Sequence, residues 1–380
     1  MNVSSSIVTA TTINTDPKLA VFELATHLSD DRIRFILFFC SGSYNLVKLS
    51  AALNDHFEGV EISGCTTAGE ITPDGYKRGS ITAIGFVADH FSVQLGAIRD
   101  LRSFSLNDAQ TMVTALRHQS TLDPSVSRDF AITLVDGLSI DEEIFLATLN
   151  SALGSIPFFG GSAGDDVNLA KTHVFFEGEF HTDAAVVLLV STHYQFEVFT
   201  THHLKPTKTK FVVTEADPLT RRVVELNAGV AADEYARALG VTVDQLTDDL
   251  CTMNPLAVKL GDRYFVRSVQ SVNSDRSLTF FCAMEAGIAL TLMQPADLAT
   301  DLNELFLDIT SRIGEPQLVI GCDCFLRRRE AEIKGVDQSI SNLLQAFKVI
   351  GLNTYGEQFS GMHINQTFTA VAIGYRLTNE

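Results

Sequence analysis

The chain has 380 residues, 46% of them hydrophobic and 9% aromatic, so it can bury a substantial core and form about two domains. Its 46 acidic and 28 basic residues give a formal net charge of -18, which repels nucleic-acid phosphates and anionic lipids. We therefore expect neither a nucleic-acid nor a membrane partner. The apolar runs are far shorter than the ~18 residues of a spanning helix, and residues 1–17 lack an export signal, which predicts a cytoplasmic protein.

One structural pattern occurs three times along the chain: an apolar strand, an amphipathic helix, a second strand that ends in a glycine loop, and a third strand. We expect these elements at 33–40, 45–57, 64–70 and 80–88, then at 130–137, 141–153, 160–166 and 183–190, and finally at 316–324, 337–349, 351–357 and 366–374. The strands are nearly continuous apolar runs, so both sheet faces should be covered. This predicts an α/β fold with mixed sheets from repeated strand-helix-strand-strand units.

The segment from about 195 to 312 has a different character. It contains short strands and helices, and an antiparallel meander with a turn at Asn273 to Asp275. An amphipathic helix then leads into the third unit. We predict a strand-rich α+β segment in the C-terminal half and a domain boundary between 195 and 210.

Each repeated loop has two glycines followed by an acid, which is Glu70, Asp165 or Glu357. Glycine permits a positive φ or a close backbone approach, and loops at the carboxyl ends of strands are where α/β sheets usually bind ligands. A single loop of this kind is equally consistent with a tight connection between strands. Its threefold recurrence favours a shared ligand site.

The common catalytic motifs are absent: the chain has no P-loop, GxSxG elbow, HExxH or dinucleotide GxGxxG sequence. Cys322 and Cys324 form a C-x-C pair, but no second cysteine or histidine pair stands nearby to complete a zinc site. Cys65 is either a buried thiol or, if a histidine approaches it, an activated nucleophile. The six cysteines lack the dense spacing of a disulfide framework, so we expect them to be reduced.

Three histidines lie in suggestive places. His363 follows the third glycine loop beside Tyr355 and Glu357, whereas His173 and His181 follow the second loop. Neutral imidazole is the commonest metal ligand, but an isolated histidine is also often a hydrogen-bonded structural side chain. Phenylalanine and tyrosine residues surround both regions, which suits either a flat apolar ligand or an ordinary core.

Long motifs in this sequence resemble the FIST family of bacterial sensory proteins over nearly the whole chain. GCTTAGEI and GGSAGDD resemble signatures of the N-terminal FIST domain, expected at 25–200. VVELNAGVAADEYARALG, YFVRSVQ, CDCFLRRRE and YGEQFSGMHINQTFTAVAIG resemble those of the C-terminal FIST domain, expected at 201–376. Within the family, DCFLRR, NTYGEQ and MHINQT are most similar to the NosP branch of haem proteins that bind nitric oxide.

The resemblance implies a non-enzymatic cytoplasmic sensor that binds haem and nitric oxide. His363 would be the haem-iron ligand, with His181 and His173 as alternatives. Glu357 or Glu70 would hold the other ring nitrogen of that histidine, and Arg327 with Arg328 would pair with haem propionates or a ligand carboxylate.

The family also implies a separate signalling partner, a histidine kinase or a cyclic-di-GMP enzyme, because the chain shows no attached kinase, cyclase or methyl-accepting segment. One alternative is a FIST sensor of a small metabolite such as an amino acid, without haem. A thiol enzyme built on Cys65 is a third reading of the sequence.

Overall fold

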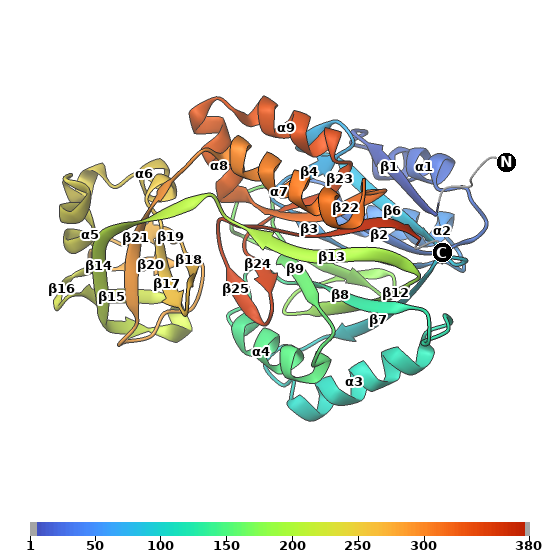
Figure 1. Cartoon of the computed structure of the whole chain (residues 1–380), viewed down its shortest axis with the longest axis horizontal. Helices are drawn as coiled ribbons and strands as arrows, with labels where there is room; N and C mark the ends of the chain where they lie inside the picture. The colour runs from blue at the N-terminus through green and yellow to red at the C-terminus, as the bar shows by residue number, and fades with distance from the viewer. Residues whose placement is uncertain (1–5, 377–380) are drawn as a thin grey trace.

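The structure is a computed structural model that describes residues 6–376, except for the side chain of Arg376. Three repeats form the body of the molecule, and a smaller β-rich unit is inserted into the third repeat (Figure 1). Repeat 1 contains β1 (Ile7–Thr12), α1 (Pro17–His27), β2 (Ile33–Ser41), α2 (Leu46–His56), β3 (Glu61–Thr67), β4 (Glu70–Thr72), β5 (Gly75–Lys77) and β6 (Ile81–Val87). Repeat 2 contains β7 (Phe91–Ile98), α3 (Leu106–Gln119), β8 (Arg128–Val135), α4 (Glu142–Leu153), β9 (Phe158–Ser162), β10 (Val174–Phe176), β11 (Glu179–His181) and β12 (Ala185–Thr192).

Repeat 3 is divided by the inserted unit. It contains β13 (Tyr194–Thr201), α7 (Leu298–Ile313), β22 (Leu318–Cys324), α8 (Phe325–Lys334), α9 (Asp337–Ala346), β23 (Val349–Thr354), β24 (Glu357–Phe359), β25 (Met362–Ile364) and β26 (Phe368–Arg376). The insert contains β14 (Leu204–Asp217), η1 (Pro218–Thr220), β15 (Arg222–Leu226), β16 (Gly229–Val230), α5 (Ala231–Leu239), η2 (Val243–Gln245), α6 (Asp248–Met253), β17 (Leu256–Leu260), β18 (Arg263–Arg267), β19 (Val269–Val272), β20 (Leu278–Phe280) and β21 (Ala289–Pro295).

The three predicted units are confirmed, and the structure adds an outer strand and a helix to each of them. β1 with α1, β7 with α3, and β13 with α7 extend the three units in the same way. Local signals fix where these helices begin. Asp16 caps α1 ahead of Pro17, and Ser105 and Asp108 form a capping box at the start of α3.

Each repeat donates a β-hairpin to the sheet of another repeat. The β4–β5 hairpin of repeat 1 extends the sheet of repeat 3, β10–β11 of repeat 2 extends that of repeat 1, and β24–β25 of repeat 3 extends that of repeat 2. The three resulting sheets have the orders β1-β6-β2-β3-β10-β11, β25-β24-β9-β8-β12-β7 and β13-β26-β22-β23-β4-β5. This cyclic exchange joins the repeats into one body.

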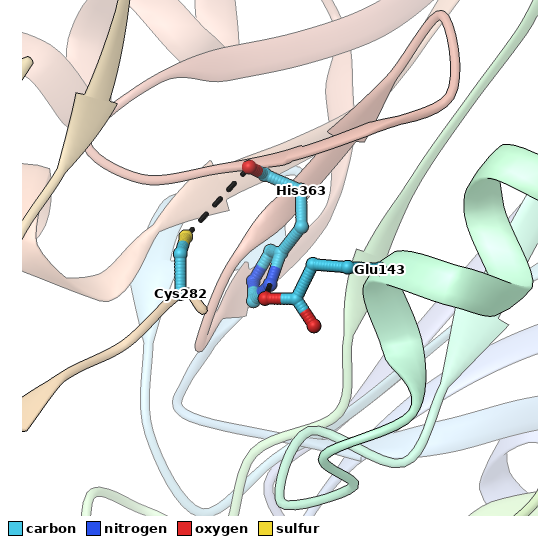
Figure 2. Close-up of side chains that lie close together, drawn as sticks. All are labelled: Glu143, Cys282 and His363. Carbon is cyan, nitrogen blue, oxygen red and sulfur yellow. Dashed lines mark hydrogen bonds and ion pairs between the residues drawn. The ribbon is translucent and has the colours of Figure 1, made fainter. Parts of the chain in front are cut away.

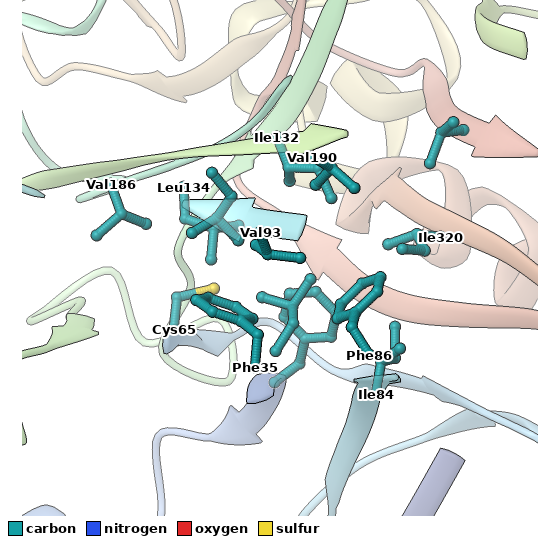
Figure 3. Close-up of a cluster of buried hydrophobic side chains, with 14 of the residues drawn as sticks. Phe35, Cys65, Ile84, Phe86, Val93, Ile132, Leu134, Val186, Val190 and Ile320 are labelled. Atoms are coloured by element: carbon teal, nitrogen blue, oxygen red, sulfur yellow. The ribbon is translucent and has the colours of Figure 1, made fainter. Parts of the chain in front are cut away.

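The three sheets share one hydrophobic core. The inward face of each sheet contributes to it, for example through Phe35, Ile132 and Ile320 (Figure 3). The opposite faces pack against helices: α1 and α2 cover the first sheet, α3 and α4 the second, and α7 and α9 the third (Figure 1). Burial on both faces explains why the sequences of β2, β8 and β22 are almost continuously apolar.

The inserted unit has its own core and its own sheet, with the order β18-β17-β21-β14-β15-β20-β19 and with β16 paired to β15. The predicted meander is present, and the turn between β19 and β20 is closed by the hydrogen bonds of Asn273 with Arg276 and Ser277. β13 pairs with β26, so residues 194–201 complete the sheet of repeat 3. In the described part of the chain, no helix is long and apolar enough to cross a membrane.

Candidate functional site

The three glycine loops meet at one end of the shared core. Backbone hydrogen bonds connect each loop with another: Asn353 N–H donates to Gly69 O (2.7 Å), Gly164 N–H to Thr66 O (3.0 Å), and Ser162 N–H to Gly356 O (2.8 Å). The Tyr355 hydroxyl donates to Asp165 Oδ1 and accepts from Leu169 N–H. The sequence repeats therefore converge in space, as a shared site requires.

The acids of these loops accept hydrogen bonds from residues of their own repeat and so fix the shape of the loops. Glu70 accepts hydrogen bonds from Thr67 and Ser80, and Glu357 accepts equivalent bonds from Thr354 and Thr367. Burial raises the pKa of Glu70 to about 7 and that of Glu357 to about 8, against the opposing effect of these hydrogen bonds.

Asp165 has the same kind of role in the second loop. It accepts hydrogen bonds from the backbone N–H groups of Leu169, Ala170 and Lys171 at 2.7 to 2.8 Å. All three acids thus have internal partners that fix the shape of their loops.

A small recess lies between these loops and the inserted unit. We call it the Tyr355 recess; it has a volume of about 180 Å³. Its walls come from repeat 2, repeat 3 and the insert: Gly137, Leu138, Ile140, Leu169, Leu219, Thr220, Arg221, Gln270, Thr279, Phe281 and Tyr355. At ~30 Å³ per water molecule, this volume suits a compact ligand with a short apolar part and a polar group.

Arg221 is the positively charged side chain that lines the Tyr355 recess. Its NH2 group donates to Ser139 O at 2.9 Å and to Glu143 Oε2 at 3.2 Å, so it joins the insert to repeat 2. Its buried Nε–H has no partner among the described residues. A guanidinium that lines a small recess of mixed polar and apolar residues, and that keeps one buried N–H without a partner, is suited to a carboxylate ligand.

Beyond Arg221 lies a polar cluster of Glu142, Glu143, Cys282 and His363, all buried except the partly exposed Glu143; three of its members are shown in Figure 2. His363 Nδ1 lies 3.2 Å from Glu143 Oε1 and 3.6 Å from Glu142 Oε2. Burial lowers the pKa of His363, but the charges of Cys282 and Glu142 and the hydrogen bonds outweigh it, and the pKa lies well above its ordinary value. His363 Nδ1 therefore faces two carboxylates.

The partners of two predicted site residues differ from those we expected. His363 contacts Glu143 and Glu142, and not Glu357 or Glu70, because those two carboxyls are turned into their own loops. Arg327 is 1% exposed and paired with Asp323 at 2.7 Å, next to His203. It therefore belongs to a buried ion-pair network and is not accessible to a ligand carboxylate.

His173 and His181 lie on or beside the β10–β11 hairpin, in the sheet of repeat 1. The His181 ring stacks on Phe176 at 4.0 Å between centroids, and His173 packs edge-on against Phe180. Burial lowers the pKa of His173. Of the predicted site residues, Tyr355 lines the recess, and His363 lies against Gly356, the residue that follows Tyr355. His173, His181 and Arg327 lie elsewhere.

A second hollow, which we call the His202 groove, has a volume of about 550 Å³. It lies where three sheet-edge strands, β13, β18 and β25, approach α7. Its lining residues are Glu197, Val198, Phe199, Thr200, Thr201, His202, Asp262, Arg263, Tyr264, Phe265, Leu305, Arg312, Phe359, Ile364 and Thr367. Burial lowers the pKa of His202, and neither its Nδ1 nor Thr200 Oγ1 has a partner within residues 6–376.

Sequence reasoning missed Arg221, Glu143, Cys282 and His202. The first three come from separate segments of repeat 2 and the insert, and no local motif marks them. His202 lies in the polar stretch that we interpreted as a domain boundary.

Comparison with known families identifies the chain. Residues 34–229 match the FIST N domain, and residues 231–360 match the FIST C domain. The chain belongs to the FIST family. FIST domains are sensor domains that bind small ligands. The two FIST matches meet inside the inserted unit, at β16.

A comparison of this FIST protein with curated proteins gives no match. Among solved structures, it is similar to one described as a cyanuric acid hydrolase that evolved by structural concatenation. The two chains are 9% identical, with a TM-score of 0.37, and the alignment covers 97% of this chain and 99% of the other.

Proposed function

We propose that this FIST protein is a sensor, and not an enzyme, that binds a small carboxylate-bearing metabolite such as an amino acid in the Tyr355 recess. The observation that carries the proposal is the position of Arg221, which lines the recess, keeps an unpartnered Nε–H and contacts Glu143. Apolar walls from Leu138, Leu169 and Phe281 would receive the side chain of the ligand.

The same position gives a route from ligand to output. Arg221 belongs to the insert, whereas Ser139 and Glu143 belong to repeat 2. A carboxylate that attracts Arg221 competes with these contacts and changes the relative stability of two arrangements of the insert and the body. A separate partner, a histidine kinase or a cyclic-di-GMP enzyme, would distinguish these arrangements.

Isothermal titration calorimetry against the proteinogenic amino acids and small dicarboxylates tests the proposal. We expect one or a few related compounds to bind with a stoichiometry of one per chain. If no compound in this set binds, while the protein is folded by circular dichroism, the recess is not a carboxylate site.

Haem was the cofactor implied by the NosP resemblance, and the structure does not accommodate it at His363. A Cβ atom placed on Gly356 would lie 1.8 Å from His363 Nε2, so the backbone of Gly356 occupies the space in front of that nitrogen. Nδ1 faces Glu143. Neither nitrogen has room for a bulky haem group. A hollow of about 350 Å³ lies beside the β10–β11 hairpin and is lined in part by Phe175, Glu177 and Gly178. Neither His173 nor His181 lines it.

The His202 groove fits haem better and supports nitric-oxide sensing as a second candidate function. Its volume is within the range of cofactor sites, roughly 300–1,000 Å³. Its walls include Phe199, Phe265 and Phe359. His202 would hold the iron as a neutral imidazole, and Arg263 and Arg312 would pair with the propionates. When bound, haem would supply an iron that takes up a diatomic gas.

Titration with hemin distinguishes the two candidates. Haem in the His202 groove predicts a stoichiometric Soret band that shifts with nitric oxide, is lost in His202→Ala and is unchanged in His363→Ala. A band that His202→Ala leaves intact, or no stoichiometric band, would rule out this second candidate and leave the carboxylate proposal unaffected.

A further inference from the structure

The largely buried polar cluster beside Arg221 has the composition of a metal site. One donor atom from each of Glu143, Cys282 and His363 lies within 4.8 Å of the other two, and among the described residues this is the one such group of three. The donors come from α4, from the segment after β20 and from β25 (Figure 2). Three separate segments thus place a carboxylate, a thiol and an imidazole around one point.

Glu142 provides an independent observation. Its Oε1 accepts hydrogen bonds from Ser162 and Gln358, but its Oε2 has no hydrogen-bond partner within the described structure. The residue is 0% exposed, and Oε2 lies 3.6 Å from His363 Nδ1. An unsatisfied carboxylate oxygen in a buried site is costly, and a cation at this position would remove that cost.

Neighbouring groups hold the Glu143 carboxylate in place, as expected for a metal ligand. Arg221 binds the other oxygen of Glu143, Oε2, and the Ala283 N–H donates to Oε1 at 2.8 Å. Ligating carboxylates in metal sites are typically fixed by such outer hydrogen bonds. Because Gly356 lies against Nε2, Nδ1 is the ring nitrogen of His363 that faces the other donors.

We infer that Glu143, Cys282 and His363, with Glu142 Oε2 beside His363 Nδ1, form a binding site for one divalent transition-metal ion, for which Zn²⁺ is the best match. Nitrogen, sulfur and carboxylate oxygen are the three donor types that Zn²⁺ uses, whereas Mg²⁺ and Ca²⁺ prefer oxygen alone. Binding would displace the protons of the Cys282 thiol and of His363 Nδ1. The ion would fasten the insert, through Cys282, to repeats 2 and 3. This inference does not rest on a ligand in the Tyr355 recess.

Cobalt substitution tests the site. Protein produced with Co²⁺ in place of Zn²⁺ should bind one Co²⁺ per chain. Its visible spectrum should show the absorption of a distorted tetrahedral cobalt site and a sulfur-to-cobalt charge-transfer band. Added Zn²⁺ should displace it. Cys251→Ala is a matched control, since Cys251 is also a free buried cysteine but lies in α6, outside the cluster.

We expect Cys282→Ala to lose the charge-transfer band and at least ~100-fold in Co²⁺ affinity, while Cys251→Ala retains both. Glu142→Gln keeps the thiolate and should retain the charge-transfer band with weaker binding, which covers the case in which Cys282→Ala fails to fold. Wild-type chain without stoichiometric Co²⁺, or a charge-transfer band that persists in Cys282→Ala, would overturn the inference.

Discussion

Arg221 of the inserted unit lies 3.2 Å from Glu143 of helix α4, and both side chains are largely withdrawn from solvent. This pair joins two parts of the molecule that have separate hydrophobic cores. It also connects the Tyr355 recess to His363, because Glu143 contacts both Arg221 and His363. A ligand in the recess would therefore act directly on the contact between the insert and the body.

Replacing Arg221 should weaken binding of the carboxylate ligand. A hydrogen bond to a charged group contributes ~1.5–3 kcal/mol, so Arg221→Gln should weaken binding by about 10-fold to 100-fold in calorimetric titrations. Arg222→Gln is the control, because Arg222 pairs with Asp275 and does not line the recess. Equal affinities for the two variants would show that the ligand binds elsewhere.

Gly356 should tolerate no larger residue as long as the His363 ring is present. The Cβ atom of Gly356→Ala would lie 1.8 Å from Nε2, so we expect a loss of at least ~3 kcal/mol in the free energy of unfolding. In the His363→Ala background the same substitution should cost much less, and a double-mutant cycle in urea measures the difference. Additive effects would mean that the ring is not what occupies this space.

Glu357 should make the protein less stable as the pH rises. Its pKa in the folded state, about 8, is above the ordinary value of 4.5, so the folded state binds this proton more tightly. The stabilisation is complete below about pH 4.5 and is lost as the pH rises through about 8. Glu70, with a pKa of about 7, has the same sign.

Glu357→Gln should therefore flatten the fall in the free energy of unfolding between about pH 5 and about pH 8, by up to a few kcal/mol. Glu304→Gln, which changes an exposed acid on α7, should leave the slope as it is in wild type. If the slope of Glu357→Gln matches that of Glu304→Gln, then Glu357 is already ionised at neutral pH.

Arg327 should matter for folding and not for ligand affinity. It lies with Asp323, Tyr76 and His203 in a buried network. Removing one partner of such a network leaves an uncompensated charge, so Arg327→Met should cost ~3–5 kcal/mol in denaturant unfolding. The fraction that folds should bind ligand or hemin with unchanged affinity. A selective loss of affinity with normal stability would restore Arg327 to the site.

Much of the fold could be predicted from local sequence. Continuous apolar runs such as 33–40 mark strands buried on both faces, and the glycine loops mark where they end. The hairpin exchange could not be predicted, since β4, β10 and β24 pair with strands of other repeats and their own sequences do not state the partner. The edge strand β1 is partly exposed, so its pattern was too weak to join it to the first repeat.

The candidate site was predictable only in part. His363 and Tyr355 follow a recognisable loop, but their contacts with Glu143 and Arg221 depend on segments far apart in the chain. Arg327 follows a strand and begins a run of three arginines, which is equally typical of an exposed helix. Its burial follows from its ion pair with Asp323 on β22, and only the folded arrangement shows that pairing.

Hydrogen–deuterium exchange of the wild-type chain, with and without the tightest compound of the carboxylate set, tests the central claim most directly. We predict slower exchange in the segments that surround the recess, 137–143, 219–221 and 279–283, and changed exchange at 362–366 through Glu143 and His363. The segments of the His202 groove, 197–202 and 262–265, should be unaffected. Protection confined to the groove, with no change around Arg221, would contradict the claim that the recess between the insert and the body is the sensor site.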